Sequence, residues 1–138
     1  CYFLKKTNKD LESKTKETPL FSLNGKHFDA KIVYIYDGDT MHCVFKVFGE
    51  YYRWNCRIWG VDTPEIRTKN EGEKKKGIEV RDILRNKLQD KILTIKCYDF
   101  DKYGRLLIDV YIENGTLLSQ WLILNNYGYT YNGGTKKR

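Results

Sequence analysis

The feature that most constrains the fold is a period of two in the apolar residues of one segment. From Met41 to Phe48, the apolar residues Met41, Cys43, Phe45 and Val47 occupy every second position, which predicts a strand with one buried face. The preceding run from Phe28 to Asp37 is apolar, aromatic and β-branched, and it predicts another strand. Asp37-Gly38 lies between them and indicates a tight turn, because glycine tolerates a positive φ. A third strand, from Tyr51 to about Gly60, would complete a three-stranded meander.

A different periodicity follows the meander. After a basic, glycine-containing loop at 69–77, apolar residues recur at helical spacing and predict an amphipathic helix. Two more strands are predicted at Ile92–Tyr98 and Leu106–Ile112, joined by a polar turn. A short second helix should follow, with Ser119 as its cap and Gly128 at its C-terminal end.

This order of elements predicts the fold class. Three strands, a helix, two strands and a helix fit an α+β protein built on a partly open five-stranded barrel of the oligonucleotide-binding (OB) type. A length of 138 residues fits one domain. We expect a polar arm or linker at 1–25, the barrel domain at 26–134 and a basic tail at 135–138. The chain begins with Cys1 instead of Met, which predicts a fragment of a longer protein.

The charge of the chain predicts the class of partner. The formal net charge is +7, so we expect a polyanion, with nucleic acid first and anionic lipid second. No stretch approaches the roughly 20 apolar residues that cross a bilayer, so no membrane span is expected. No obligate protein partner is implied.

The four cysteines are too scattered for a disulfide scaffold, and they form no Cys-x-x-Cys pair. Three of them fall in strand-like apolar runs, where free cysteine packs as a small hydrophobe. Reduced cysteines favour an intracellular, reducing compartment.

Four polar clusters interrupt the apolar pattern. They are residues 37–40, Arg57 with residues 62–65, residues 101–105 and the tyrosine- and glycine-rich residues 127–134. Each also has a plain structural explanation: a hairpin turn, a helix start, a solvated turn and aromatic packing at the barrel end. Arg57 is different, because an arginine in an apolar strand requires an anion, either a carboxylate or a phosphate.

Together the clusters supply what phosphodiester hydrolysis needs. Aspartates are hard oxygen ligands for Ca²⁺ or Mg²⁺, and paired arginines neutralise a phosphate in its transition state. A glutamate can orient or deprotonate water. Exposed tyrosines can stack unpaired bases, which favours single-stranded DNA or RNA as the partner.

Three motifs occur in order along the chain: DGDT at 37–40, RIWGVDTPE at 57–65 and DKYGR at 101–105. Together they resemble the staphylococcal nuclease (thermonuclease) family, over roughly Lys31 to Gly128. The resemblance implies a five-stranded OB barrel with packed helices. It also implies Ca²⁺-dependent hydrolysis of DNA and RNA with little sequence or sugar specificity, giving 5′-hydroxyl and 3′-phosphate ends.

The resemblance also implies roles for particular residues. Asp39 and Asp62 would ligate calcium together with the carbonyl of Thr63. Glu65 would hold the attacking water, with its role as base or positioner left open.

The remaining roles concern the phosphate and the nucleotide. By the same resemblance, Arg57 and Arg105 would grip the phosphate. The residues implied for nucleotide binding are Lys102, Tyr103, Tyr129 and Tyr131.

Two functions from different classes fit these residues. The first is an active nuclease, and the second is a non-catalytic OB-fold module that binds nucleic acid or serves as a scaffold. A non-catalytic module should show gaps among the charged positions, and the sequence has none: Asp39, Arg57, Asp62, Glu65 and Arg105 are all present. The sequence therefore favours the enzyme.

Overall fold

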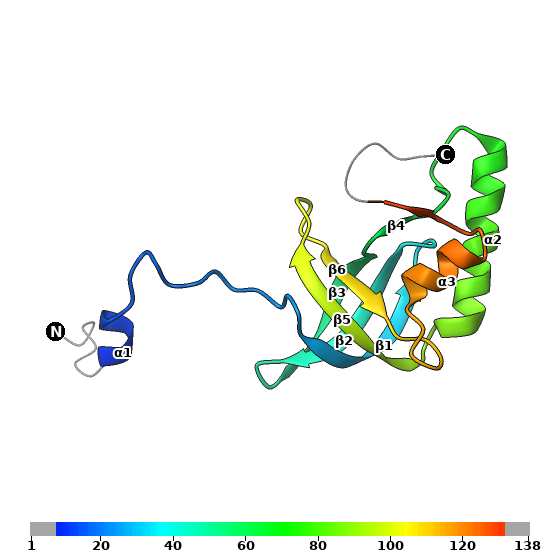
Figure 1. Ribbon diagram of the computed structural model, residues 1–138. Coiled ribbons are helices and arrows are strands. Elements are labelled where there is room, and N and C mark those ends of the chain that lie inside the picture. The colour runs from blue at the N-terminus through cyan, green and yellow to red at the C-terminus, as the bar shows by residue number, and fades with distance from the viewer. Residues whose placement is uncertain (1–7, 132–138) are drawn as a thin grey trace.

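The computed structural model describes residues 8–131, and its long strands form a closed five-stranded barrel (Figure 1). Around the barrel the order is β1-β2-β3-β6-β5, antiparallel except for the parallel pair β3–β6. The predicted five-stranded OB-type barrel is confirmed. It is closed instead of partly open, because β6 pairs with both β3 and β5 and β1 pairs with β5. The strands are β1 (His27–Ile35), β2 (Thr40–Val47), β3 (Glu50–Ile58), β5 (Ile92–Phe100) and β6 (Leu106–Val110).

The predicted alternation on β2 fills the barrel. Met41, Cys43, Phe45 and Val47 are all buried, while the residues between them are partly or fully exposed. Each inward side chain removes apolar surface from water and stabilises the barrel. Burial of this one face fixes the register of β2, since a slip by one residue would expose the whole set.

The cysteines of the described residues behave as the sequence predicts. Cys43, Cys56 and Cys97 are free and buried. Burial, with Cys43 nearby, raises the pKa of Cys97 to about 12. The Cys97 thiol therefore stays protonated, and the three buried cysteines pack as small apolar groups. Cys1 lies outside the described residues.

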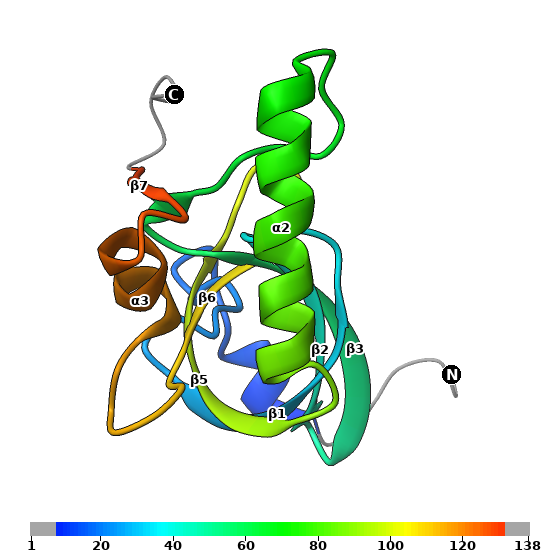
Figure 2. The ribbon, with the colours of Figure 1, turned by 90° about the vertical axis from the view of Figure 1, so that its right-hand side faces the viewer.

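The long helix α2 (Glu71–Leu88) begins within the segment 69–77 that we expected to be a loop. The side chain of Asn70 caps this helix by accepting a hydrogen bond from the N–H of Glu73. Gly77 is needed for close packing: a Cβ there would lie 2.8 Å from the carbonyl oxygen of Pro64. The prediction of a loop was wrong from residue 71 onward. Gly77 does not interrupt the helix, because its role is to allow contact between the helix and the backbone at Pro64. Figure 2 shows α2 along the outside of the barrel.

The second helix, α3 (Leu118–Leu124), is not capped by Ser119. Its N-cap is Leu117, which makes no side-chain cap hydrogen bond. Ser119 is buried inside the helix, where its N–H and its hydroxyl both donate to the carboxylate of Asp109 on β6. The cap prediction was wrong because this residue ties α3 to the barrel.

A small second sheet was not expected from the sequence. It pairs β4 (Val61–Asp62) with β7 (Tyr129–Thr130). Gly128 allows this approach, since a Cβ there would lie 2.7 Å from Cγ2 of Val61. Gly128 does not end α3, which stops at Leu124. Residues 62–65 do not begin a helix either. Asp62 is the last residue of β4, Thr63 follows it, and the next helix begins only at Glu71.

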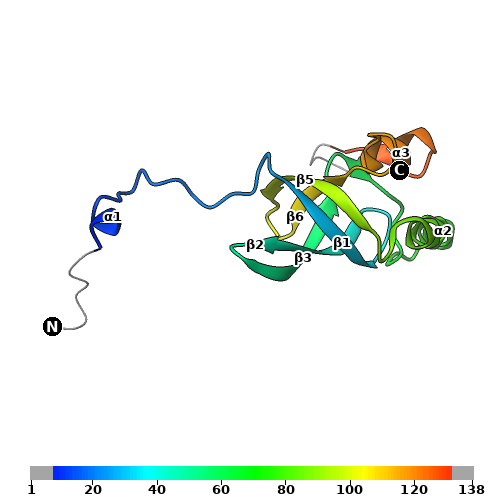
Figure 3. The same cartoon turned by 90° about the horizontal axis from the view of Figure 1, so that it is seen from below.

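The N-terminal arm extends away from the barrel, on the side opposite α2 and α3 (Figures 1 and 3). It contains the short helix α1 (Lys9–Glu12). Its contact with the barrel includes a hydrogen bond from the Ser22 hydroxyl to Asp99 (2.7 Å) and the burial of Leu23. The expected tail at 135–138 lies outside the described residues, as do residues 132–134.

Within residues 8–131, we find no helix with the length and apolar character needed to span a membrane.

Candidate active site

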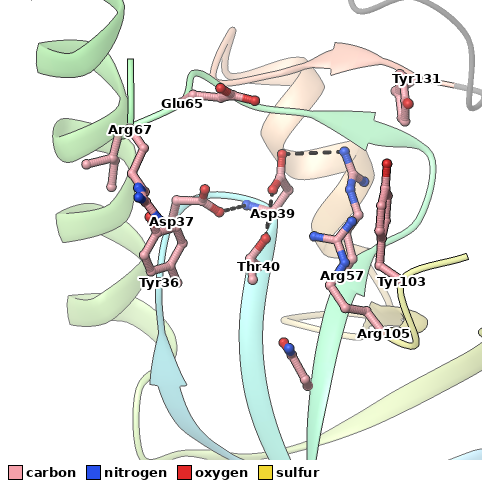
Figure 4. A pocket seen from close by; sticks show the side chains of 12 residues that line it. Tyr36, Asp37, Asp39, Thr40, Arg57, Glu65, Arg67, Tyr103, Arg105 and Tyr131 are labelled. Carbon is pink, nitrogen blue, oxygen red and sulfur yellow. Dashed lines mark hydrogen bonds and ion pairs between the residues drawn. The ribbon is translucent and has the colours of Figure 1, made fainter. Parts of the chain in front are cut away.

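Six of the ten predicted site residues line one cleft of about 580 Å³ at one end of the barrel (Figure 4). Register explains why they meet: Thr40 at the start of β2 pairs with Arg57 near the end of β3. The N–H of Ile58 also donates to the carbonyl of Asp39 (2.8 Å). The predicted residues that line the cleft are Asp39, Arg57, Glu65, Tyr103, Arg105 and Tyr131.

Asp39 is a buried carboxylate held in one orientation. Its Oδ2 accepts hydrogen bonds from the N–H and the hydroxyl of Thr63, both at 3.0 Å. Its Oδ1 accepts from the hydroxyl of Thr40 at 3.1 Å. These contacts fix the carboxylate at the mouth of the cleft.

Gly38 makes this contact between two loops possible. A Cβ at Gly38 would lie 2.7 Å from Oγ1 of Thr63. The φ of Gly38 is not positive, so our reason for this glycine was wrong. Close approach, not backbone conformation, requires glycine at this turn.

Arg57 is the buried cation of the site. Its Nη1 donates to the carbonyl oxygens of Ile58 (2.8 Å) and Val61 (3.0 Å). Its Nη2 lies 3.6 Å from Oδ2 of Asp39 and 3.7 Å from Oδ1 of Asp62. The anion that Arg57 requires is therefore supplied in this structure by carboxylates.

The carboxylates beside Arg57 outnumber it. Asp62 and Asp39 both face Arg57, and they are 1% and 6% exposed. Such an excess of buried negative charge suits a bound cation, and carboxylate and carbonyl oxygens are the ligands of Ca²⁺. Among residues 8–131, no three His, Cys, Asp or Glu side chains are arranged to hold a metal ion. The protein side chains of a metal site here would thus be two aspartates.

Asp37 was expected only as a turn residue, but it lines the cleft. Its Oδ1 accepts a hydrogen bond from the N–H of Asp39 (3.1 Å). Burial, and then the charge of Asp39, raise the pKa of Asp37 to about 7. The folded protein therefore keeps a proton on Asp37 up to about pH 7. The unfolded chain, whose aspartates have pKa values near 4, releases this proton at a lower pH.

This shift predicts how stability depends on pH without metal. Between about pH 4 and pH 7 the folded state binds the extra proton, so the free energy of unfolding should fall as pH rises. Asp37→Asn stays neutral and should be more stable than wild type by ~2–4 kcal/mol at pH 8, with little difference at pH 4. Urea unfolding of both proteins between pH 4 and pH 8, in the presence of a chelator, measures this difference in the free energy of unfolding. If this free energy had the same slope against pH in both proteins, the burial of a charge on Asp37 would be contradicted.

Glu65 lies on the segment between β4 and α2, and its side chain is drawn at the opening of the cleft (Figure 4). Its backbone N–H donates to Oε2 of Glu73 on α2 (3.1 Å). The close contact of Gly77 with this backbone adds a second constraint. The helix therefore fixes the backbone of Glu65 beside the cleft.

Arg105 is held in the turn before β6 by Asp101. Its Nε donates to Oδ2 of Asp101 (2.9 Å), and Oδ1 accepts from the N–H groups of Tyr103 and Arg105. Burial works to raise the pKa of Asp101, but these N–H groups and the guanidinium lower it overall. The carboxylate stays charged and fixes Arg105 on the same wall of the cleft as Arg57 (Figure 4).

A second hollow, of about 500 Å³, adjoins the first and shares Arg57, Tyr103, Arg105 and Tyr131 with it. Lys102 lines this second hollow. Tyr129, on β7 opposite Asp62, lines neither hollow.

Some lining residues were missed from the sequence. Trp59 lines the second hollow, and Asn55 and Arg67 line the first. Asn55 shares the face of β3 with Arg57 at a spacing of two, a signal that could have revealed it. Arg67 lies in a segment without periodicity, where no such signal exists.

Comparison with known proteins agrees with this geometry. Residues 55–137 match the family described as staphylococcal nuclease homologue. The chain belongs to this family. It is also 30% identical to an uncharacterized protein of Methanocaldococcus jannaschii, over 125 residues that cover 75% of this chain and 58% of the relative. The chain thus matches little more than half the length of that relative.

Membership confirms the resemblance read from the three motifs. The match begins in β3 and includes Arg57, Asp62, Glu65 and Arg105, whereas Asp39 lies before it.

Proposed function

We propose that this chain is a Ca²⁺-dependent nuclease that hydrolyses single-stranded DNA and RNA with little sequence or sugar specificity. The observation that carries the proposal is one cleft with two arginines on one wall, facing buried carboxylates. Two adjacent guanidinium groups attract a phosphate between them, and the carboxylates supply sites for a cation and a water.

The metal-binding residues we propose are Asp39, Asp62 and the carbonyl of Thr63. They fit calcium because their donors are hard oxygens, and because two buried carboxylates face the single guanidinium of Arg57. With only two carboxylates, most of the remaining ligands would be water or substrate oxygens. When bound, Ca²⁺ would polarise a phosphoryl oxygen as a Lewis acid.

The chain's own residues perform the remaining tasks. Glu65, held at the opening through Glu73, orients the attacking water and takes its proton. Arg57 and Arg105 stabilise the added negative charge as water oxygen bonds to phosphorus. The bond from phosphorus to the 5′ oxygen then breaks, and that oxygen takes up a proton. The products carry a 3′-phosphate and a 5′-hydroxyl.

The second hollow suits an unpaired base. Tyr103, Tyr131 and Trp59 line it, and Lys102 adds positive charge. The Trp59 ring stacks on Tyr98 with a centroid distance of 4.7 Å, which orders it before a base arrives. Base stacking on aromatic side chains tolerates any sequence, and it requires an unpaired strand. Tyr129 would flank this hollow without lining it.

A non-catalytic binding module is the alternative function. Such a module would retain both hollows, but it would not need Glu65 to be held beside the cleft by Glu73. End-group analysis decides between them: incubation of single-stranded DNA and of RNA with the protein and Ca²⁺ should yield fragments with 3′-phosphate and 5′-hydroxyl ends. Intact strands that are bound but never cut would favour the module.

A further inference from the structure

Arg67 stands on the wall of the cleft opposite Arg57 and Arg105. Figure 4 shows it beside Tyr36, with Asp37 and Asp39 between it and the other two arginines. All three arginines line the same cleft of about 580 Å³. The cleft therefore presents positive charge on both sides of its carboxylates.

The backbone that carries Arg67 is fixed. Glu73 on α2 accepts a hydrogen bond from the N–H of Glu65 (3.1 Å) and another from the hydroxyl of Thr68 (3.5 Å). The N–H of Asn70 donates to the hydroxyl of Thr68 (3.2 Å). Arg67 lies between residues 65 and 68, which both donate hydrogen bonds to Glu73 on α2. The backbone position of Arg67 is therefore fixed by the helix.

The guanidinium of Arg67 is available to a ligand. It is exposed, and within residues 8–131 it makes no hydrogen bond or ion pair with the protein. Arg57 and Arg105, by contrast, are paired with Asp39, Asp62 and Asp101. An arginine beside carboxylates that nevertheless pairs with none of them is suited to an external anion.

We propose that Arg67 binds a second phosphate of the same polynucleotide, on the far side of the carboxylates from the phosphate held by Arg57 and Arg105. A strand that crosses the cleft must pass the carboxylates of Asp39 and Glu65, which repel its charge. Positive charge on both walls offsets that repulsion and holds the strand at two points. The ring of Tyr36 lies beside Arg67 and offers an apolar surface to the intervening sugar. This inference rests on the proposed function and adds that the substrate is a strand of at least two phosphates.

The test compares two substrates. One is a twelve-nucleotide single strand of thymidine, and the other is a thymidine with a single 4-nitrophenyl phosphodiester. Arg67→Gln should raise KM for the oligomer about tenfold more than KM for the single phosphodiester, since one charge-assisted contact is lost. Arg67→Lys should recover most of the loss. Arg81→Gln, the same charge change on α2 outside both hollows, should behave as wild type. Equal KM changes for both substrates, or none, would overturn the proposal.

A binding measurement keeps the inference separate from the nuclease activity. Fluorescence anisotropy of a labelled oligomer, in Ca²⁺ and with Glu65→Gln to prevent cleavage, gives the salt dependence of the binding constant. Adding Arg67→Gln should reduce the slope of log K against log salt by about 0.7, the value for one phosphate contact on a single strand. An unchanged slope contradicts the role of Arg67 even if the wild type cleaves. A changed slope supports it even if the wild type only binds, in which case the nuclease proposal alone fails.

Discussion

Arg105→Ala is expected to lower kcat on single-stranded DNA by about 10³-fold, the scale of losing a charged contact to a phosphoryl transition state. The barrel should remain folded. Arg105 is partly exposed, and its ion pair with Asp101 contributes little to stability at such a site. Asp101 keeps its hydrogen bonds from the backbone N–H groups of residues 103 and 105.

Single-turnover cleavage rates and thermal unfolding measure these two effects separately. Arg81→Ala serves as the control, because it removes the same charge from the outside of α2. A cleavage rate within a few-fold of wild type would remove Arg105 from the reacting phosphate. A large loss of stability would mean that the turn, and not the phosphate, needs this side chain.

Arg105 is a cleaner test than Arg57. Arg57 is buried, donates to two carbonyl oxygens and faces two carboxylates. Its removal would leave that buried negative charge uncompensated, which costs about 3–5 kcal/mol. A slow Arg57→Ala variant would therefore mix loss of structure with loss of catalysis.

Asp39→Asn is expected to raise the Ca²⁺ concentration for half-maximal cleavage by about tenfold or more. A dipositive ion loses an anionic ligand, while the amide keeps the size of the side chain and an oxygen that can accept from Thr63. Calcium titrations of the cleavage rate, and calorimetric titrations without substrate, measure the change.

The matched control is Asp82→Asn, an acidic residue exposed on α2. It should leave the calcium requirement unchanged. If Asp39→Asn also needs no more calcium than wild type, then Asp39 is only a structural partner of Thr63 and Arg57.

The barrel and most of the charged residues of the cleft could be predicted, because both follow simple rules. Alternation from Met41 to Val47 marks a face that must be buried, whatever surrounds it. Arg57 in an apolar strand required an anion, and Asp39 and Asp62 supply it. Such signals are local, so one sequence is enough to show them.

The errors arose where a distant contact overrides local preference. Gly77 suggested a loop, but the helix needs it to approach Pro64. Ser119 suggested a cap, but Asp109 on β6 holds it inside the helix. The ladder of β4 and β7 is too short for any periodicity to show.

Arg67 could not be found for a similar reason. It lies in an irregular segment, and only the contacts of Glu73 with residues 65 and 68 fix where that segment runs. These contacts depend on where α2 begins, which the sequence pattern misplaced.

The most direct test of the proposed mechanism is cleavage of single-stranded DNA by the wild-type chain and by Glu65→Gln, each with Ca²⁺, with Mg²⁺ and with a chelator. The proposed mechanism predicts cleavage by the wild type in Ca²⁺, none in the chelator, and a rate about 10²–10⁴-fold lower for Glu65→Gln in Ca²⁺. Cleavage that survives the chelator, or a Glu65→Gln variant as fast as wild type, would contradict it.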